Sequence, residues 1–144
     1  MEWRKENYRI STDNTQLQLE FIHQELNKTY WAEGIDVETL NIAIANSLNF
    51  GLYANERQIG FARFITDYAT FAYMADVFVL NEFRGQGLGK WLVQCMLAYP
   101  GTERYRKLLL ATTTAAGLYE KFGFEQSKNP SLYWQIHRPD VYKT

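Results

Sequence analysis

A cluster of glycines forms the segment of this chain whose chemistry is easiest to infer. Gly85, Gly87 and Gly89 lie within the stretch Arg84-Gly85-Gln86-Gly87-Leu88-Gly89-Lys90, between an apolar run and a helical pattern. Glycines let the backbone approach a ligand closely, and the free N–H groups and positive dipole end of the following helix attract anions. The segment therefore predicts a site for a phosphorylated ligand and suits a diphosphate. A tight strand-to-helix turn that binds no ligand is the alternative.

The spacing of these glycines separates three kinds of phosphate-binding loop. A Walker loop needs a glycine at position 84 and Ser or Thr at position 91, where this chain has Arg84 and Trp91. A dinucleotide fingerprint needs a glycine at position 90, which is Lys90. The pattern that fits is Arg/Gln-x-x-Gly-x-Gly, so ATP hydrolysis and dinucleotide binding are disfavoured.

A second motif lies downstream, in Ala115-Ala116-Gly117-Leu118-Tyr119-Glu120-Lys121-Phe122-Gly123-Phe124. Together with the glycine segment, and in the same order, it resembles the GNAT superfamily of N-acetyltransferases along nearly the whole chain. The resemblance implies that Tyr119 lies near the thioester sulfur of acetyl-CoA and protonates the departing thiolate. Amine attack on a thioester needs such a donor within hydrogen-bond reach of the sulfur. For Tyr119 taken alone, the alternative is a half-buried tyrosine with its hydroxyl at the surface.

The resemblance also implies which residues hold acetyl-CoA as cosubstrate. The pyrophosphate would lie on the glycine loop, from Arg84 through Lys90, and the backbone of Val77, Phe78 and Val79 would pair with the pantetheine amides. Many relatives carry Asn three residues before Ala115, whereas this chain reads Thr112-Thr113-Thr114. Thr112 or Thr113 could offer a hydroxyl in its place.

Two carboxylates are candidates for the base that deprotonates the acceptor ammonium. Asp76 interrupts the apolar strand Ala75-Asp76-Val77-Phe78-Val79, so it faces either the active cleft or solvent. Glu33 lies in Tyr30-Trp31-Ala32-Glu33-Gly34, a segment that often borders the acceptor site in the family. Its aromatic neighbours suit an ammonium ligand, but the alternative is that they pack a helix onto the sheet while Glu33 stays solvated.

The cysteine and the two histidines give weaker indications of function. The single cysteine, Cys95, lies among apolar residues at helical spacing, which favours a buried thiol over an acyl-cysteine intermediate. His23 and His137 belong to no metal-like cluster, so we expect no metal.

Composition limits the class of protein. The chain has 144 residues and fits one domain, 1–144, with 47% hydrophobic residues and a net charge of −1. It lacks the excess of basic residues typical of nucleic-acid binding and has no apolar stretch long enough to span a bilayer. We therefore expect neither a nucleic acid nor a membrane as a partner. The polar N-terminus and the lone cysteine indicate a cytoplasmic protein.

The elements that must position these residues follow from periodicity. Helices are expected at Leu17–Asn27, after the N-cap Asp36 with apolar Val37, Leu40, Ile44 and Leu48, at Leu88–Ala98 and at Ala115–Phe122. Strands are expected around Tyr8–Ile10, in a hairpin about the turn Asn55-Glu56-Arg57, at Phe71–Leu80, at Leu108–Leu110 and at Leu132–Ile136, with one more possible at Phe124-Glu125. The order βααβββαβαβ favours an α/β (α+β) domain. With the resemblance, it implies a mixed, mostly antiparallel central sheet flanked by about four helices.

No segment of the sequence identifies the acceptor. Small amines and peptide amines remain equally open, and so does an acetyl-CoA sensor without efficient catalysis, although an intact Tyr119 favours an enzyme. A homodimer is a further expectation, since relatives commonly pair through a C-terminal strand.

Overall fold

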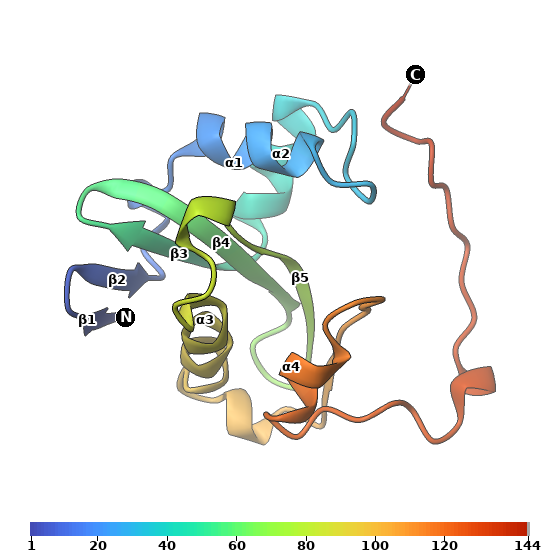
Figure 1. Ribbon diagram of the computed structural model, residues 1–144. Coiled ribbons are helices and arrows are strands. Elements are labelled where there is room, and N and C mark those ends of the chain that lie inside the picture. Colours follow the sequence, from blue (N-terminus) through green and yellow to red (C-terminus); the bar gives the residue numbers. More distant parts are fainter. Residues whose placement is uncertain (144) are drawn as a thin grey trace.

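A six-stranded sheet forms the middle layer of the computed structural model, which describes residues 1–143 (Figure 1). The strands follow one another across the sheet in chain order: β1 (Glu2–Lys5), β2 (Tyr8–Ser11), β3 (Leu48–Ala54), β4 (Arg57–Thr66), β5 (Phe71–Val79) and β6 (Lys107–Leu109). The first five strands are antiparallel to their neighbours, and β6 runs parallel to β5. The expected mixed, mostly antiparallel sheet is confirmed.

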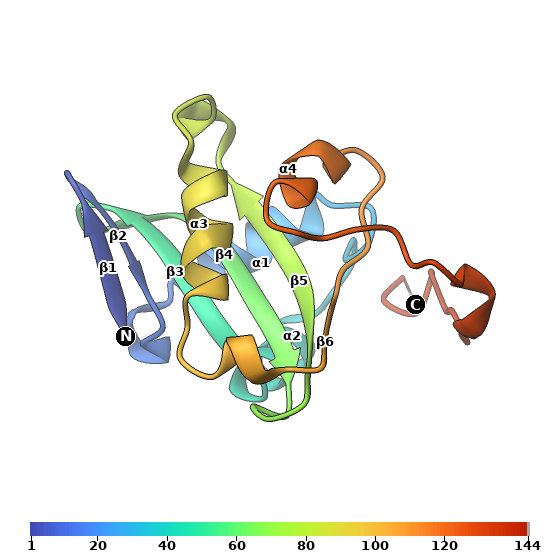
Figure 2. The same cartoon turned by 90° about the horizontal axis from the view of Figure 1, so that it is seen from below.

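Helices cover both faces of this sheet, as Figure 2 shows from below. On one face, α1 (Leu19–Asn27) and α2 (Val37–Ala45) bury an apolar stripe against Phe61 and Phe78. On the other, α3 (Leu88–Leu97) and α4 (Ala116–Glu120) pack over a second core that contains Phe50 and Phe64. Burial of these apolar faces on a common sheet provides the main driving force for the fold.

Local sequence signals set the ends of the elements near the cleft. The Asp36 carboxylate accepts from the Thr39 N–H at 3.1 Å and caps α2, as expected. At the end of α4, Gly123 adopts a φ of +91°, and the Phe124 N–H bonds back to the Tyr119 carbonyl. This glycine ending turns the chain so that Phe124 packs on Tyr119.

The pairing between β5 and β6 is short. It joins Phe71 to Lys107, Ala72 to Leu108 and Tyr73 to Leu109, after which the two chains diverge. Within residues 1–143, no strand lies on that side of β5 from Met74 to Val79. Its backbone N–H and C=O groups there form an open sheet edge beside the site.

Most expected elements are confirmed with ends shifted by one or two residues, and three expectations are wrong. Leu48 belongs to β3 rather than to the second helix, and Val37 is 53% exposed. The strands expected at Leu132–Ile136 and Phe124-Glu125 do not form within the described residues.

The wrong C-terminal strand has a physical cause. Leu132, Trp134 and Ile136 alternate as in a strand, yet 62%, 93% and 81% of their surfaces are exposed, because this segment runs outside the body of the chain (Figure 1). Alternation without a neighbouring strand leaves backbone groups unpaired, so the pattern does not produce a strand within the single chain.

Among the described residues, no helix has the length and apolarity needed to cross a membrane.

Candidate functional site

The glycine loop leads directly from β5 into α3. Gly85 and Gly87 have φ of +82° and +78°, in the left-handed region that favours glycine, and Gly87 is the N-cap of α3. The cap has no side-chain hydrogen bond. Within residues 1–143, the N–H groups of Leu88, Gly89 and Lys90 find no backbone or side-chain acceptor, since the helical bonding begins with Trp91. These amides therefore form a group of free donors at a helix N-terminus.

The space in front of the loop is open. A Cβ built on Gly85 or Gly87 would have no heavy atom within 4 Å, and one on Gly89 would meet only Val79 Cγ2 at 4.0 Å. Packing inside the chain therefore does not require glycine at these positions. The backbone conformation of Gly85 and Gly87 does require it, and the free space could admit a ligand.

Side chains tie the loop to the sheet. Arg84 Nε donates to the Val79 carbonyl at 3.1 Å, and Tyr8 Oη donates to Gln86 Oε1 at 3.0 Å. Lys90 is exposed on the first turn of α3. The predicted loop residues Arg84 to Lys90 are thus brought together at one end of β5.

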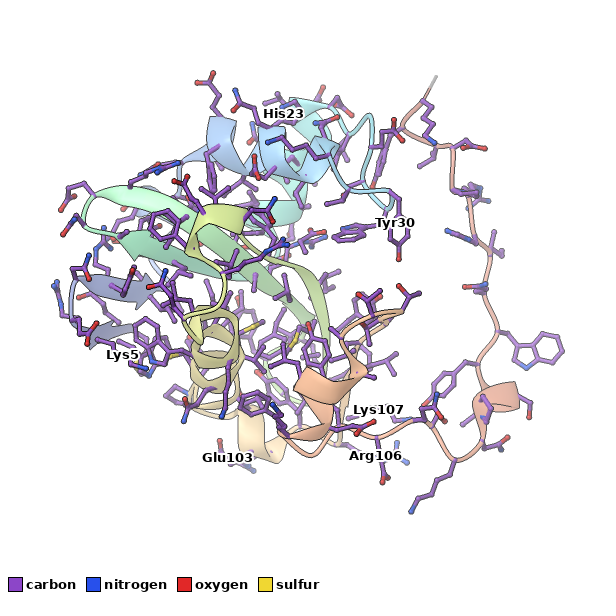
Figure 3. All side chains as sticks on the ribbon, viewed as in Figure 1. Lys5, His23, Tyr30, Glu103, Arg106 and Lys107 are labelled. Atoms are coloured by element: carbon purple, nitrogen blue, oxygen red, sulfur yellow. The ribbon has the colours of Figure 1, made fainter. Side chains whose placement is uncertain are left out.

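A cavity of about 500 Å³ lies where β5 and β6 diverge, within the size range of small-molecule sites. Its floor is the β5 stretch from Met74 to Val77, and its opposite wall is the segment 110–115 with Tyr119. Tyr30 and Trp31, from the connection between α1 and α2, close a third side. Figure 3 shows Tyr30 pointing from that connection toward this region.

Tyr119 lies on α4 and lines the cavity with 9% of its surface exposed. Its ring meets Phe124 edge-on, with centroids 5.8 Å apart. Burial raises the pKa of its phenol, so the hydroxyl keeps its proton at neutral pH. Because the side chain lines the cavity, the hydroxyl can act there as a hydrogen-bond donor.

Asp76 also lines the cavity, but its carboxylate is engaged on both oxygens. Oδ2 accepts from Arg63 Nε at 2.7 Å, and Oδ1 accepts from Trp31 Nε1 at 3.1 Å. Asp76 has a φ of +56° and lies near a register shift between β4 and β5. The structure therefore places Asp76 with Tyr119 in one cavity, as a paired carboxylate.

The remaining predicted residues divide between the cavity and other places. Val77, Thr112 and Thr113 line it, and Thr112 Oγ1 accepts from the Ala115 N–H at 3.0 Å. The side chains of Phe78 and Val79 do not line it; Phe78 packs on Phe21 and Phe61 on the other face of the sheet.

Glu33 is not brought into the cavity. Its carboxylate lies 3.6 Å from Lys143 Nζ at the surface, with 61% of the side chain exposed. Trp31, which the sequence reasoning named only as an aromatic neighbour of Glu33, lines the cavity, and so does Arg63, which that reasoning missed. The available signal was the charge of Arg63 in an apolar strand, opposite a second strand interrupted by Asp76.

The other reactive groups lie away from this chemistry. Cys95 is buried inside the core, and desolvation raises its thiol pKa to about 12, so it is not a nucleophile at neutral pH. Among residues 1–143, no three His, Cys, Asp or Glu side chains are gathered in a way that could hold a metal ion.

Known proteins are similar to this chain in sequence. Residues 45–126 match the family model described as an acetyltransferase (GNAT) domain. A protein of Gibberella zeae, assigned by name to the acetyltransferases, is 31% identical over 140 residues, covering 83% of this chain and 79% of its own.

Solved structures agree with the family match. A structure from Xanthomonas campestris pv. campestris, described as a GNAT-family acetyltransferase, is 42% identical, with a TM-score of 0.92 over 95% of this chain and 97% of that one. An acetyltransferase structure from Clostridium acetobutylicum is 16% identical, with a TM-score of 0.61 over 95% and 96% of the two chains, and shows the fold alone. The family match covers more than half of the chain and contains the glycine loop and Tyr119, so this protein belongs to the GNAT acetyltransferases.

Proposed function

We propose that this protein moves the acetyl group of acetyl-CoA directly to a primary amine. The observation that carries the proposal is the continuous path formed by the glycine loop, the open edge of β5 and the cavity under Tyr119. The Clostridium acetobutylicum structure was solved with acetyl-CoA, and it shares this fold. That structure supports the choice of cosubstrate.

The residues present fit acetyl-CoA on structural grounds. The free amides of Leu88, Gly89 and Lys90 suit a diphosphate, with open space in front of them. The open backbone of Val77 and the N–H of Val79, whose carbonyl already accepts from Arg84, can pair with the amides of an extended pantetheine chain, as a strand would. Thr112 and Thr113 offer hydroxyls on the opposite wall.

Tyr119 is the proposed general acid. Acetyl-CoA supplies an activated acetyl group, whose C–S bond breaks as the amine nitrogen bonds to the carbonyl carbon. Tyr119 then gives its phenolic proton to the leaving sulfur, the nitrogen releases a proton to solvent as the amide forms, and Tyr119 recovers its own proton from solvent. Because burial raises the pKa of this phenol, the acid form persists across the neutral range.

The acceptor ammonium must also lose a proton before it attacks, since only the neutral amine is nucleophilic. The Asp76 carboxylate faces this cavity, but Arg63 and Trp31 already donate to it. We propose that this proton leaves to water in the open cavity rather than to a dedicated side chain.

The test is acetyl-CoA-dependent thiol release over a panel of amines and lysine peptides, with a blank that lacks acceptor. Tyr119→Phe should lower kcat by about 10²-fold or more, the usual contribution of a general acid, while leaving acetyl-CoA affinity unchanged. Tyr105→Phe is the matched control, because Tyr105 is equally buried at 8% and lines no part of this cavity. Full turnover by Tyr119→Phe would remove the assigned acid. Binding of acetyl-CoA without transfer to any acceptor by the unaltered protein would favour a sensor.

We also propose that a second copy of the chain pairs with the C-terminal segment. Leu132, Trp134 and Ile136 present an exposed apolar strand pattern. The same chain carries a groove along β6, lined by Leu108 and Phe124 among others. Exchange of this segment between two copies would cover both surfaces at once and give the segment a strand neighbour.

A further inference from the structure

A network of hydrogen bonds joins three parts of the fold and holds the aromatic side of the cavity in place. Arg63 Nη1 donates to Ser47 Oγ at 2.9 Å, Arg63 Nε donates to Asp76 Oδ2 at 2.7 Å, and Trp31 Nε1 donates to Asp76 Oδ1 at 3.1 Å. The Arg63 and Asp76 side chains are only 14% and 10% exposed. The indole of Trp31 is therefore fixed to the sheet through a buried ion pair.

Trp31 needs such an anchor. It lies in the turn-rich connection between α1 and α2, with 49% of its surface exposed, and its neighbour Tyr30 is 73% exposed. The two rings meet edge-on at 5.1 Å. The hydrogen bond to Asp76 is the polar contact that holds this aromatic pair against the cavity.

The cavity offers no free charge to a ligand. Among its lining residues, all within the described part of the chain, Arg63 and Asp76 are the charged ones, and they neutralise each other. The rest of this end is apolar or aromatic and includes Ile35, Ile65 and Tyr73. A ligand with a second ammonium group would lose hydration there without gaining a counterion.

We propose that the acceptor is a primary amine on an uncharged, apolar or aromatic body, and that Arg63 and Asp76 are positioning residues that hold Trp31 as the wall for this body. The inference rests on the proposed acetyl transfer and adds the class of acceptor to it. Asp76 acts through Trp31 and takes no proton in the reaction.

The first experiment compares hexylamine with 1,6-diaminohexane, which differ by one terminal ammonium. Calorimetry in the presence of CoA gives their affinities, and thiol release gives their kinetics with acetyl-CoA. Hexylamine should have a Kd at least about tenfold lower and a kcat/KM at least about tenfold higher than the diamine, although the diamine has two reactive ends. Equal values, a preference for the diamine, or no binding of either amine would overturn the inference. Selective binding of hexylamine without any thiol release would leave the inference standing and remove the proposed transfer.

The second experiment tests the wall. Trp31→Phe keeps an aromatic ring but loses the N–H, and should raise the KM for hexylamine about five- to tenfold, the worth of one hydrogen bond, with kcat and CoA affinity retained. Trp3→Phe is the matched control, because Trp3 lies on β1 at the far edge of the sheet. An unchanged KM in Trp31→Phe contradicts the assignment.

Asp76→Asn separates positioning from proton transfer. As a positioning residue it should raise the KM, because an amide has one acceptor oxygen for the two donors Arg63 Nε and Trp31 Nε1. The double variant with Trp31→Phe should lose less than the sum of the two single changes, because both act on the same hydrogen-bond network. A fall in kcat of about 10²-fold with unchanged KM would instead mark Asp76 as a general base and overturn its positioning role. Thermal melts confirm that each variant is folded.

Discussion

Substitution of Gly87 by alanine tests whether the glycine loop serves a ligand or only the turn. Gly87 has a φ of +78° and open space where a Cβ would lie, so alanine there meets no neighbour and pays only the backbone cost. That cost is roughly 1–2 kcal/mol for an L-residue in the left-handed region. For a domain of this size it corresponds to a fall in Tm of about 3–8 °C.

Gly101 supplies a control with nearly the same geometry. Its φ is +96°, it precedes the short 3-10 helix Thr102–Arg104, and its added Cβ also meets nothing within 4 Å. Gly101→Ala should therefore lower the Tm by a similar amount. It lies beyond the C-terminal end of α3, whereas Gly87 lies at the N-terminal end.

The two variants should differ in their affinity for coenzyme A, measured by calorimetry. Strain at Gly87 shifts the amides of Leu88 and Gly89, and losing one charge-assisted hydrogen bond costs about 1.5–3 kcal/mol, or roughly 10- to 150-fold in Kd. Gly101→Ala should bind as the unaltered protein does. If Gly87→Ala also keeps full affinity while losing the expected stability, the loop is a turn and the diphosphate site lies elsewhere.

Three further predictions concern stability and assembly. The Tyr53 hydroxyl is buried without a hydrogen-bond partner, and burial raises its pKa to about 12, whereas the unfolded phenol titrates near 10.0. The native state thus binds more protons than the unfolded state between these pH values, so the free energy of unfolding falls as the pH rises through them. Tyr53→Phe should lessen that fall by about 2–3 kcal/mol, as measured by denaturant titrations at pH 7 and pH 12. An equal fall in the two proteins would contradict this assignment. Gly51→Ala should cost about 1–3 kcal/mol, since its Cβ would lie 2.4 Å from Tyr53 Oη, and an unchanged urea midpoint would refute the steric reasoning. Sedimentation velocity should show a dimer that Trp134→Asp converts to monomer; a monomeric unaltered protein would refute the proposed exchange.

The sequence predicts the parts of the site that depend on local conformation. The glycine loop, the start of α3 and the Gly123 ending of α4 follow from glycines at positions of positive φ, and these signals act within a few residues. Periodicity also places the helices correctly, because each buries one apolar face.

The acceptor side depends on tertiary contacts that no local pattern encodes. Asp76 was found as a charge inside an apolar strand, but its engagement by Arg63 and Trp31 arises from strand register and a turn 45 residues away in sequence. The reasoning that selected Glu33 found the right connection, yet the aromatic side chains that line the cavity from it are those of Tyr30 and Trp31. Strand β1 was missed because its sequence, Glu2-Trp3-Arg4-Lys5, is mostly charged, as edge strands often are.

The brief contact between β5 and β6 also bears on how the molecule fluctuates. β6 is joined to the sheet through three residue pairs, so the amides of 107–109 should exchange with solvent through local opening, well before the interior pairs of β3 and β4. A ligand bonded both to the β5 edge and to the wall that carries Tyr119 would couple these parts mechanically. Acetyl-CoA would then slow hydrogen exchange on both sides of the cleft, and the acid would become rigid only when its substrate is in place.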